Sequence, residues 1–244
     1  MTTAARRNGA IARFFRLQPV TAWLIAANLA VYVATVVQSG SLLDNADSPL
    51  FEATALYPPF VVVLDEWWRL LTAAFQHFGP LHLLLNMYML WILGVGTERS
   101  IGHGRYLALY LISALGGSVA VMYFSPGALT AGASGAVFGL MGAYGIIAAA
   151  LRLEFRGIAV LIGLNILVSI LVPGVSLAAH MGGLVVGAVA ALVLVILPRR
   201  LPARVGRGTR RAASWGTFLL LVAVVAVAAW YSAEVMTLES VLRR

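Results

Sequence analysis

The sequence predicts an all-α protein, a polytopic transmembrane helical bundle with seven spans. Of the 244 residues, 61% are hydrophobic and 11% are charged. The mean hydropathy is +0.92, far above what a water-soluble domain of this length carries. Several apolar runs approach the roughly 20 residues that a helix needs to cross a bilayer core. The arginines gather in alternate connections between these runs, as expected of a chain that crosses a membrane repeatedly.

The seven expected spans follow one another with short connections. They lie at residues 20–37, 81–95, 106–124, 135–151, 157–172, 177–197 and 215–233. A basic segment, 1–19, precedes the first span. That span could instead be a cleaved signal peptide, but its apolar stretch is long for one and no clear Ala-x-Ala site follows it. We therefore expect it to be retained.

The distribution of arginine predicts the orientation. If segment 1–19 is cytoplasmic, the translocated segments hold only Arg69, Arg243 and Arg244 of the 17 basic residues. Translocated loops are expected to be poor in Arg and Lys. The Arg-rich stretch 198–214 is then a cytoplasmic loop that meets anionic lipid headgroups, not nucleic acid. We expect a plasma-membrane protein whose outer C-terminal tail is 234–244.

One connection, 38–80, is long and is expected on the outer side. It contains Pro58–Pro59, Trp67–Trp68 and all the aspartates of the chain. A loop with this aromatic and apolar content is expected to pack on the membrane interface. This loop is equally well explained as an anchor at the membrane interface or as an element that controls substrate entry.

Composition excludes several catalytic chemistries. The chain has no cysteine, which removes disulfides, Cys-ligated zinc and thiol catalysis. The His-Glu-x-x-His motif of zinc proteases is absent. An aspartyl protease would need two carboxylates within the membrane, whereas every Asp lies in the 38–80 loop. We expect no metal and no cofactor. The use of arginine without lysine, with much Ala, Val and Gly, hints at a bacterial source.

Polar residues within the expected spans coincide in depth. Ser134 opens the fourth span, His180 lies near the start of the sixth, and His82 and Asn86 lie in the first turns of the second. These three spans all run from outside to inside, so the four side chains share the outer part of the bilayer. Polar groups within a membrane are costly and indicate function by default.

Small residues every fourth position predict that the fourth and sixth spans pack closely. Pairing these ridges brings Ser134 towards His180, which could take the hydroxyl proton as a general base. No acidic residue lies in the outer half of any span, so a Ser–His dyad is expected. His82 and Asn86, at i and i+4, share a helix face and could stabilise an oxyanion. The ridges consist of Ala131, Gly135, Gly139 and Ala143 in one span and Ala179, Gly183, Gly187 and Ala191 in the other.

Each of these residues also has a structural reading. Ser134 alone would most often be a packing serine, and Asn86 alone more often bridges helices than binds an oxyanion. Phe138, one turn after Ser134, could stack on His180 or serve equally well as a core aromatic. The combination of the four residues at one depth is what favours catalysis.

The motifs resemble those of the rhomboid proteases. Gly132-Ala133-Ser134-Gly135 resembles the GxSG nucleophile motif of that family. His77, His82 and Asn86 match its His-x4-His-x3-Asn pattern. His180 with Gly183 and Gly187 looks like the helix of the catalytic histidine. Trp68-Arg69 resembles the Trp-Arg pair of the first loop, and Glu98 the glutamate after the second span. Several relatives have tyrosine where this chain has Phe138.

The resemblance implies a six-span core at 20–197 with a seventh span, 215–233, appended. It implies that Ser134 is the nucleophile, His180 the general base, and His82 and Asn86 the oxyanion stabilisers. The substrates would be membrane proteins, cut in or near a transmembrane helix that unwinds easily. Two other functions remain open: a membrane chaperone or scaffold that binds helices without cutting them, and a small transporter.

Overall fold

The computed structural model describes residues 13–202 and 204–242, and it is helical almost throughout. Within these described residues, six helices are long and apolar enough to cross a membrane, and α9 is a shorter apolar helix of 16 residues. Each of the seven predicted spans falls on one of these helices, but only six have full spanning length. The helices are α2 (Pro19–Ser39), α6 (Gly79–Ile101), α7 (His103–Phe124), α8 (Ser134–Leu151), α9 (Arg156–Leu171), α10 (Leu177–Ala191), continued to Arg200 by η2 and α11, and α12 (Arg207–Leu242).

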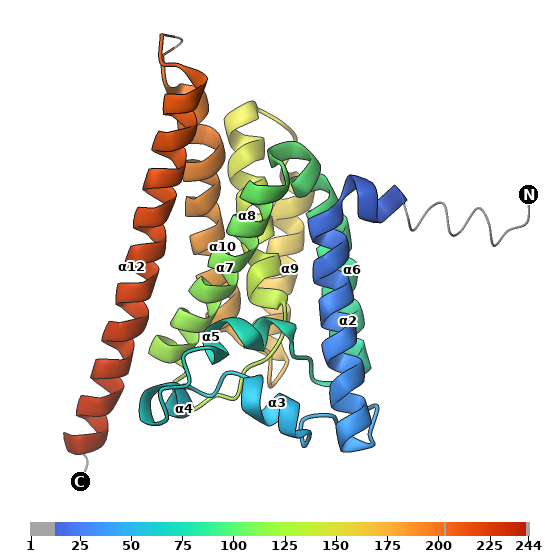
Figure 1. Ribbon diagram of the computed structural model, residues 1–244. Helices are drawn as coiled ribbons and strands as arrows, with labels where there is room; N and C mark the ends of the chain where they lie inside the picture. Colours follow the sequence, from blue (N-terminus) through green and yellow to red (C-terminus); the bar gives the residue numbers. More distant parts are fainter. Residues whose placement is uncertain (1–12, 203, 243–244) are drawn as a thin grey trace, which may run out of the picture.

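The centre of the bundle is formed by α7, α8 and α10 (Figure 1). Glycines allow the backbones of α8 and α10 to approach closely. A Cβ built on Gly183 would collide with the carbonyl group of Gly135, and one built on Gly187 would collide with the backbone of Gly139. The contacts pair the two small-residue ridges that the sequence predicts. Close approach of this kind is how membrane helices associate without a hydrophobic driving force.

The long helix α12 lies at the edge of the bundle (Figure 1). Of its most apolar window only 22% is buried, against 67% for α7. Its packing on the centre includes a hydrogen bond of 3.0 Å from the Tyr123 hydroxyl to the Ala228 carbonyl. A helix this exposed and this apolar has lipid as its natural solvent.

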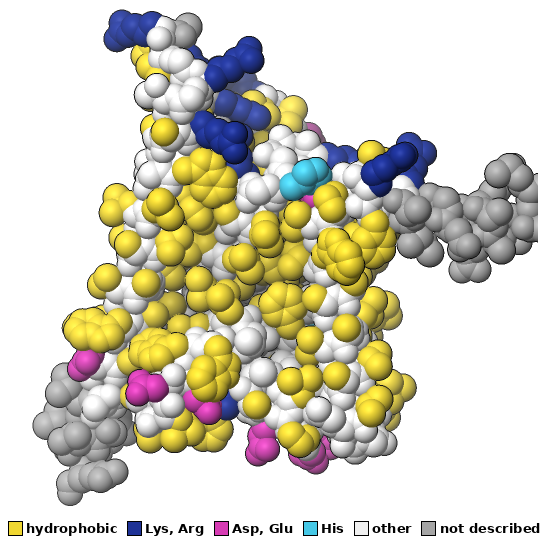
Figure 2. Space-filling model, in the orientation of Figure 1, with side chains coloured by type: hydrophobic (Ala, Val, Ile, Leu, Met, Phe, Trp, Pro, Cys, Tyr) yellow, Lys and Arg dark blue, Asp and Glu magenta, His cyan; other side chains and the backbone are white. Residues whose placement is uncertain are grey.

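The surface is divided into three zones (Figure 2). A broad band of apolar side chains covers the middle of the visible face. Arginine side chains gather at one end, where the α11–α12 connection lies, and acidic side chains gather at the opposite end. An apolar belt between two polar ends is the surface that a bilayer requires.

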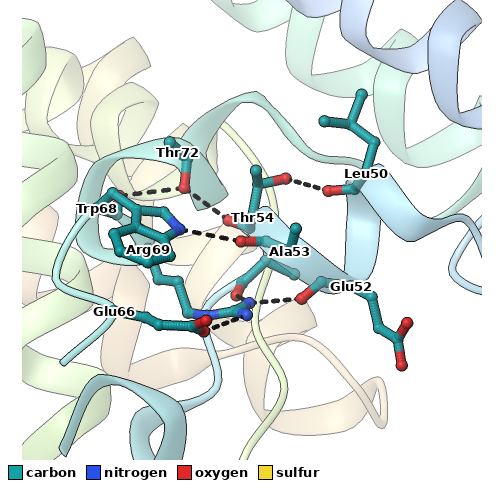
Figure 3. A network of polar contacts seen from close by, with 9 residues as sticks. Leu50, Glu52, Ala53, Thr54, Glu66, Trp68, Arg69 and Thr72 are labelled. Atoms are coloured by element: carbon teal, nitrogen blue, oxygen red, sulfur yellow. Dashed lines mark hydrogen bonds and ion pairs between the residues drawn. The ribbon is translucent and has the colours of Figure 1, made fainter. Parts of the chain in front are cut away.

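The segment between α2 and α6 is folded into short helices at the acidic end of the bundle. These are α3 (Pro49–Thr54), α4 (Pro58–Val63), α5 (Arg69–Thr72) and the 3₁₀ turn η1 (Ala73–Phe75). The Arg69 side chain ties them together (Figure 3): its guanidinium donates to the carbonyls of Glu52 and Ala55 at 2.6 and 2.7 Å and pairs with Glu66 at 2.5 Å. Arg69 is only 3% exposed, so it holds the segment as a compact cap.

The opposite end of the bundle is closed by Glu98. Its carboxylate accepts the backbone N–H groups of Val20 and Thr21 at 3.0 and 2.9 Å and the Thr21 hydroxyl at 2.7 Å. It therefore satisfies the free donors of the first turn of α2. His103 joins the same carboxylate at 2.6 Å. This glutamate fastens α2 to α6 rather than serving the site.

Candidate active site

The loop before α8 determines where Ser134 lies. An antiparallel bridge joins Leu56 and Thr130 through backbone hydrogen bonds of 2.9 and 2.8 Å. Two residues later, the Gly132 N–H donates to the Ala73 carbonyl at 2.9 Å. These bonds fasten the loop to the cap that Arg69 holds together. Ser134 is the first residue of α8 and is half-buried.

Gly132 brings the serine loop against His82. Its φ is +130°, a conformation that side chains rarely adopt. A Cβ at this position would lie 2.8 Å from His82 Cε1, 2.9 Å from His82 Nε2 and 3.7 Å from Ser134 Oγ. No side chain therefore fits here. His82 Nε2 and Ser134 Oγ border the same small space, as their shared depth predicts.

The hydrogen bonding of His82 indicates which ring nitrogen carries the proton. Its Nδ1 accepts the Phe78 N–H at 3.3 Å, and the Phe78 ring stacks on the imidazole with an interplanar angle of 12°. A neutral imidazole that accepts at Nδ1 has its proton on Nε2. The Nε2–H donor is thus the one beside Gly132 and Ser134. Asn86, 6% exposed, lies one turn further along α6, and its amide donates to the His82 carbonyl at 2.9 Å.

His180, in the first turn of α10, is held against α8. Its ring stacks on Phe138 with centroids 4.1 Å apart and planes 11° apart. The sequence leaves two roles open for Phe138, and the structure shows that it stacks on His180. Phe138 stands one turn after Ser134 on the same helix, and Gly135 faces the Ala179 carbonyl across the helix pair. The neighbours of Ser134 therefore touch His180 and the residue before it.

The Nδ1 atom of the His180 ring contacts a residue of a third helix, α9. His180 Nδ1 lies 2.6 Å from the hydroxyl oxygen of Ser169, near the end of α9. No sequence motif singles out Ser169. The sequence feature that could have indicated Ser169 is its position near the outer end of an apolar span, close to the expected depth of His180.

The Ser134 hydroxyl makes no hydrogen bond to a side chain within the residues that the structure describes. A long or missing hydrogen bond between a nucleophile and its base is common before substrate binds. The N-terminus of α8 has no side-chain cap, since its N-cap residue is Ala133. Its first backbone N–H groups remain available as donors to an anion.

His77 packs behind the site, in the connection between η1 and α6. It is fully buried, and its ring contacts that of His82 at a centroid distance of 5.1 Å. Burial, reinforced by His82, lowers the pKa of His77 to about 3. His77 is therefore neutral near pH 7 and supports His82 by packing.

The sequence matches the Rhomboid domain family over residues 64–197. Rhomboid protease GluP of Bacillus subtilis is 40% identical over 139 residues, which are 55% of this chain and 27% of that protein. RHOMBOID-like protein 2 of Arabidopsis thaliana is 31% identical, with 73% of this chain and 68% of that protein covered. Rhomboid protease AarA of Providencia stuartii is 24% identical over 75% of this chain and 74% of that protein.

The chain spans about half or less of the length of several curated relatives that it matches, such as GluP and RHOMBOID-like proteins 4 and 1. The family match nevertheless covers more than half of this chain and includes α6 to α10. The helices that carry Ser134, His180 and His82 are all within it. This multi-pass membrane protein belongs to the rhomboid family.

Proposed function

We propose that this chain is an intramembrane serine endopeptidase that cuts membrane proteins in or near their transmembrane segments. The observation that carries the proposal is the arrangement around Ser134. Phe138, on the helix that Ser134 opens, stacks on His180. Gly132, in the loop before Ser134, lies against His82 Nε2. These contacts support a site to which three helices contribute a hydroxyl, a base and an oxyanion donor. The relatives named as rhomboid proteases support the same reaction class.

In the proposed reaction, Ser134 Oγ attacks the scissile carbonyl carbon while His180 Nε2 takes the hydroxyl proton. The tetrahedral oxyanion accepts hydrogen bonds from His82 Nε2–H, the Asn86 amide and the backbone N–H of Ser134. The imidazolium then gives its proton to the leaving amine, and the C–N bond breaks. Water, deprotonated by His180, hydrolyses the acyl-enzyme and restores Ser134.

The division of the chain follows from the same proposal. Residues 20–197 form the protease core, 215–233 an added span, and 1–19 and 198–214 basic cytoplasmic segments. The N-terminus is cytoplasmic, the membrane is the plasma membrane, and the site opens on its outer face. The gathering of arginine at one end of the apolar belt supports this orientation (Figure 2).

Cleavage of a co-expressed transmembrane reporter tests the proposal. Ser134→Ala and His180→Ala should each reduce cleavage by roughly 10³-fold or more, since each removes a member of the reacting pair. Ser100→Ala is the matched control, because Ser100 is exposed near the far end of α6 and bonds only its own helix. A Ser134→Ala protein that is expressed normally and still cuts would show that the mechanism is wrong.

A further inference from the structure

We infer that Ser169 is a positioning residue for the proposed general base. Its hydroxyl oxygen accepts the Nδ1–H of His180 and thereby keeps the lone pair of Nε2 for the Ser134 proton. This inference rests on the proposed function and adds a third helix, α9, to the site.

The direction of the hydrogen bond follows from a count of protons. Ser169 Oγ lies 2.7 Å from the Asn165 carbonyl, which can only accept, so the single hydroxyl proton points there. At the 2.6 Å contact with His180 Nδ1, where the roles depend on the tautomer of the ring, Ser169 is then the acceptor. Nδ1 then carries a hydrogen, and a neutral ring with a proton on Nδ1 has its lone pair on Nε2. That is the form a general base needs.

Burial makes this contact effective. Ser169 and His180 are each 7% exposed, and hydrogen bonds strengthen where the local dielectric is low. Phe138 covers one face of the imidazole, so stacking and the Ser169 bond together restrict its tilt and rotation. The ring is held from two helices, α8 and α9.

A hydroxyl here takes the place that a carboxylate has in other serine proteases. Among the described residues, the acidic groups with basic partners are Glu66, Glu98 and Glu154, and none pairs with His180. A carboxylate buried in the membrane would be expensive, whereas a serine whose proton bonds its own helix is cheap. The hydroxyl gives orientation without an added charge.

The packing of α9 does not itself require a polar residue at this position. Within α9 only Ile158 and Ser169 are buried, and most of the helix faces outward. A small apolar residue would fill the volume of Ser169 equally well. The hydroxyl is explained by what it touches, the His180 ring.

The bond should matter most in the transition state. When His180 takes the Ser134 proton, the ring becomes an imidazolium and the Nδ1–H···O bond becomes charge-assisted. An interaction that strengthens in the transition state changes kcat more than KM. A change that only loosened substrate binding would alter KM instead.

The test compares purified full-length variants reconstituted with a transmembrane reporter. Ser169→Ala should lower kcat by roughly 10- to 100-fold, as loss of a hydrogen bond to a charged group predicts, with little change in KM. Ser169→Thr retains the hydroxyl and should restore most of kcat. Ser113→Ala is the matched control, since Ser113 is buried, bonds the Leu109 carbonyl at 2.6 Å and has no hydrogen bond to an imidazole among the described residues. It should retain wild-type kcat.

Three results would overturn the inference: unchanged kcat in Ser169→Ala, no rescue by Ser169→Thr, or an equal loss in Ser113→Ala. If Ser169→Ala does not fold, Ser169→Cys replaces it, because a thiol is nearly isosteric but a weak acceptor. Ser169→Cys should also be slow, and normal kcat would contradict the inference. Failure of the dyad itself is distinguishable, because a wild-type protein with a mistaken dyad would not react with a fluorophosphonate at Ser134.

Discussion

Each residue at the site is oriented by a specific neighbour. His82 accepts a backbone N–H from Phe78, and His180 contacts Ser169 and stacks on Phe138. Two residues before Ser134, Gly132 leaves room for the His82 ring. The proposed base and oxyanion donor are therefore oriented before substrate binds. Preorganisation of this kind reduces the entropy that the reaction must supply.

At the residue scale, His77 should make stability depend on pH. Its folded-state pKa of about 3 lies below the ordinary value of 6.5. The unfolded chain therefore binds more protons between these values, and stability, complete above about pH 6.5, falls as the pH drops, by at most about 1.4 kcal/mol per unit. Thermal unfolding in detergent should show a larger loss of Tm from pH 7 to pH 5 for the wild type than for His77→Gln. Parallel losses would contradict this assignment.

The sequence predicts the identity of the site residues better than their orientation. Ser134, His180, His82 and Asn86 are predicted from their shared depth and their motifs. The contact of Ser169 with His180 is not, because hydroxyls are common in membrane helices and only coordinates show which ring a hydroxyl meets. Gly132 belongs to a recognisable motif, but its close approach to His82 depends on a φ of +130°.

At the scale of elements, the α8–α10 contact joins the two helices that carry the proposed nucleophile and base. The small-residue ridges predict this contact because few other reasons place glycine every fourth residue in a membrane helix. The cap formed by α3 to α5 is harder to predict. Its short helices depend on one buried guanidinium that binds the carbonyls of Glu52 and Ala55, residues distant from Arg69 in the sequence.

Adding a methyl group to this helix pair should weaken the fold. A Cβ at Gly183 collides with the Gly135 carbonyl, so Gly183→Ala must separate α8 from α10. Overpacking of this kind costs about 1–3 kcal/mol, and separation would also reduce cleavage. Gly163→Ala is the control, since a Cβ there meets nothing within 4 Å. Unfolding in detergent would contradict this packing if both variants were equally stable.

At the scale of the whole molecule, the apolar belt and the asymmetry of charge describe how the chain sits in a membrane. The sequence predicts seven spans, and residues 13–202 and 204–242 contain six helices of full spanning length, with the shorter α9 between α8 and α10 in the chain. Length alone is a weak guide here, since a bilayer can thin locally around a short apolar helix. The arginines at one end predict which end faces the cytoplasm.

The orientation can be tested because the chain has no native cysteine. Asp47, just before α3, and Gly208, in the first turn of α12, are both exposed. The helix α3 and the start of α12 lie at opposite ends of the bundle (Figure 1), so a single cysteine at each position reports one end. In intact cells, a membrane-impermeant maleimide should label Asp47→Cys and should label Gly208→Cys only after lysis. The reverse pattern would contradict the proposed topology.

The central claim is that Ser134 is made nucleophilic by His180. Its most direct test is the reaction of the purified protein with a fluorophosphonate, followed by mass spectrometry to locate the modified residue. We expect one adduct, on Ser134, that forms at wild-type rate in Ser100→Ala and is nearly lost in His180→Ala. An unmodified Ser134, or labelling at the same rate without His180, would contradict the account.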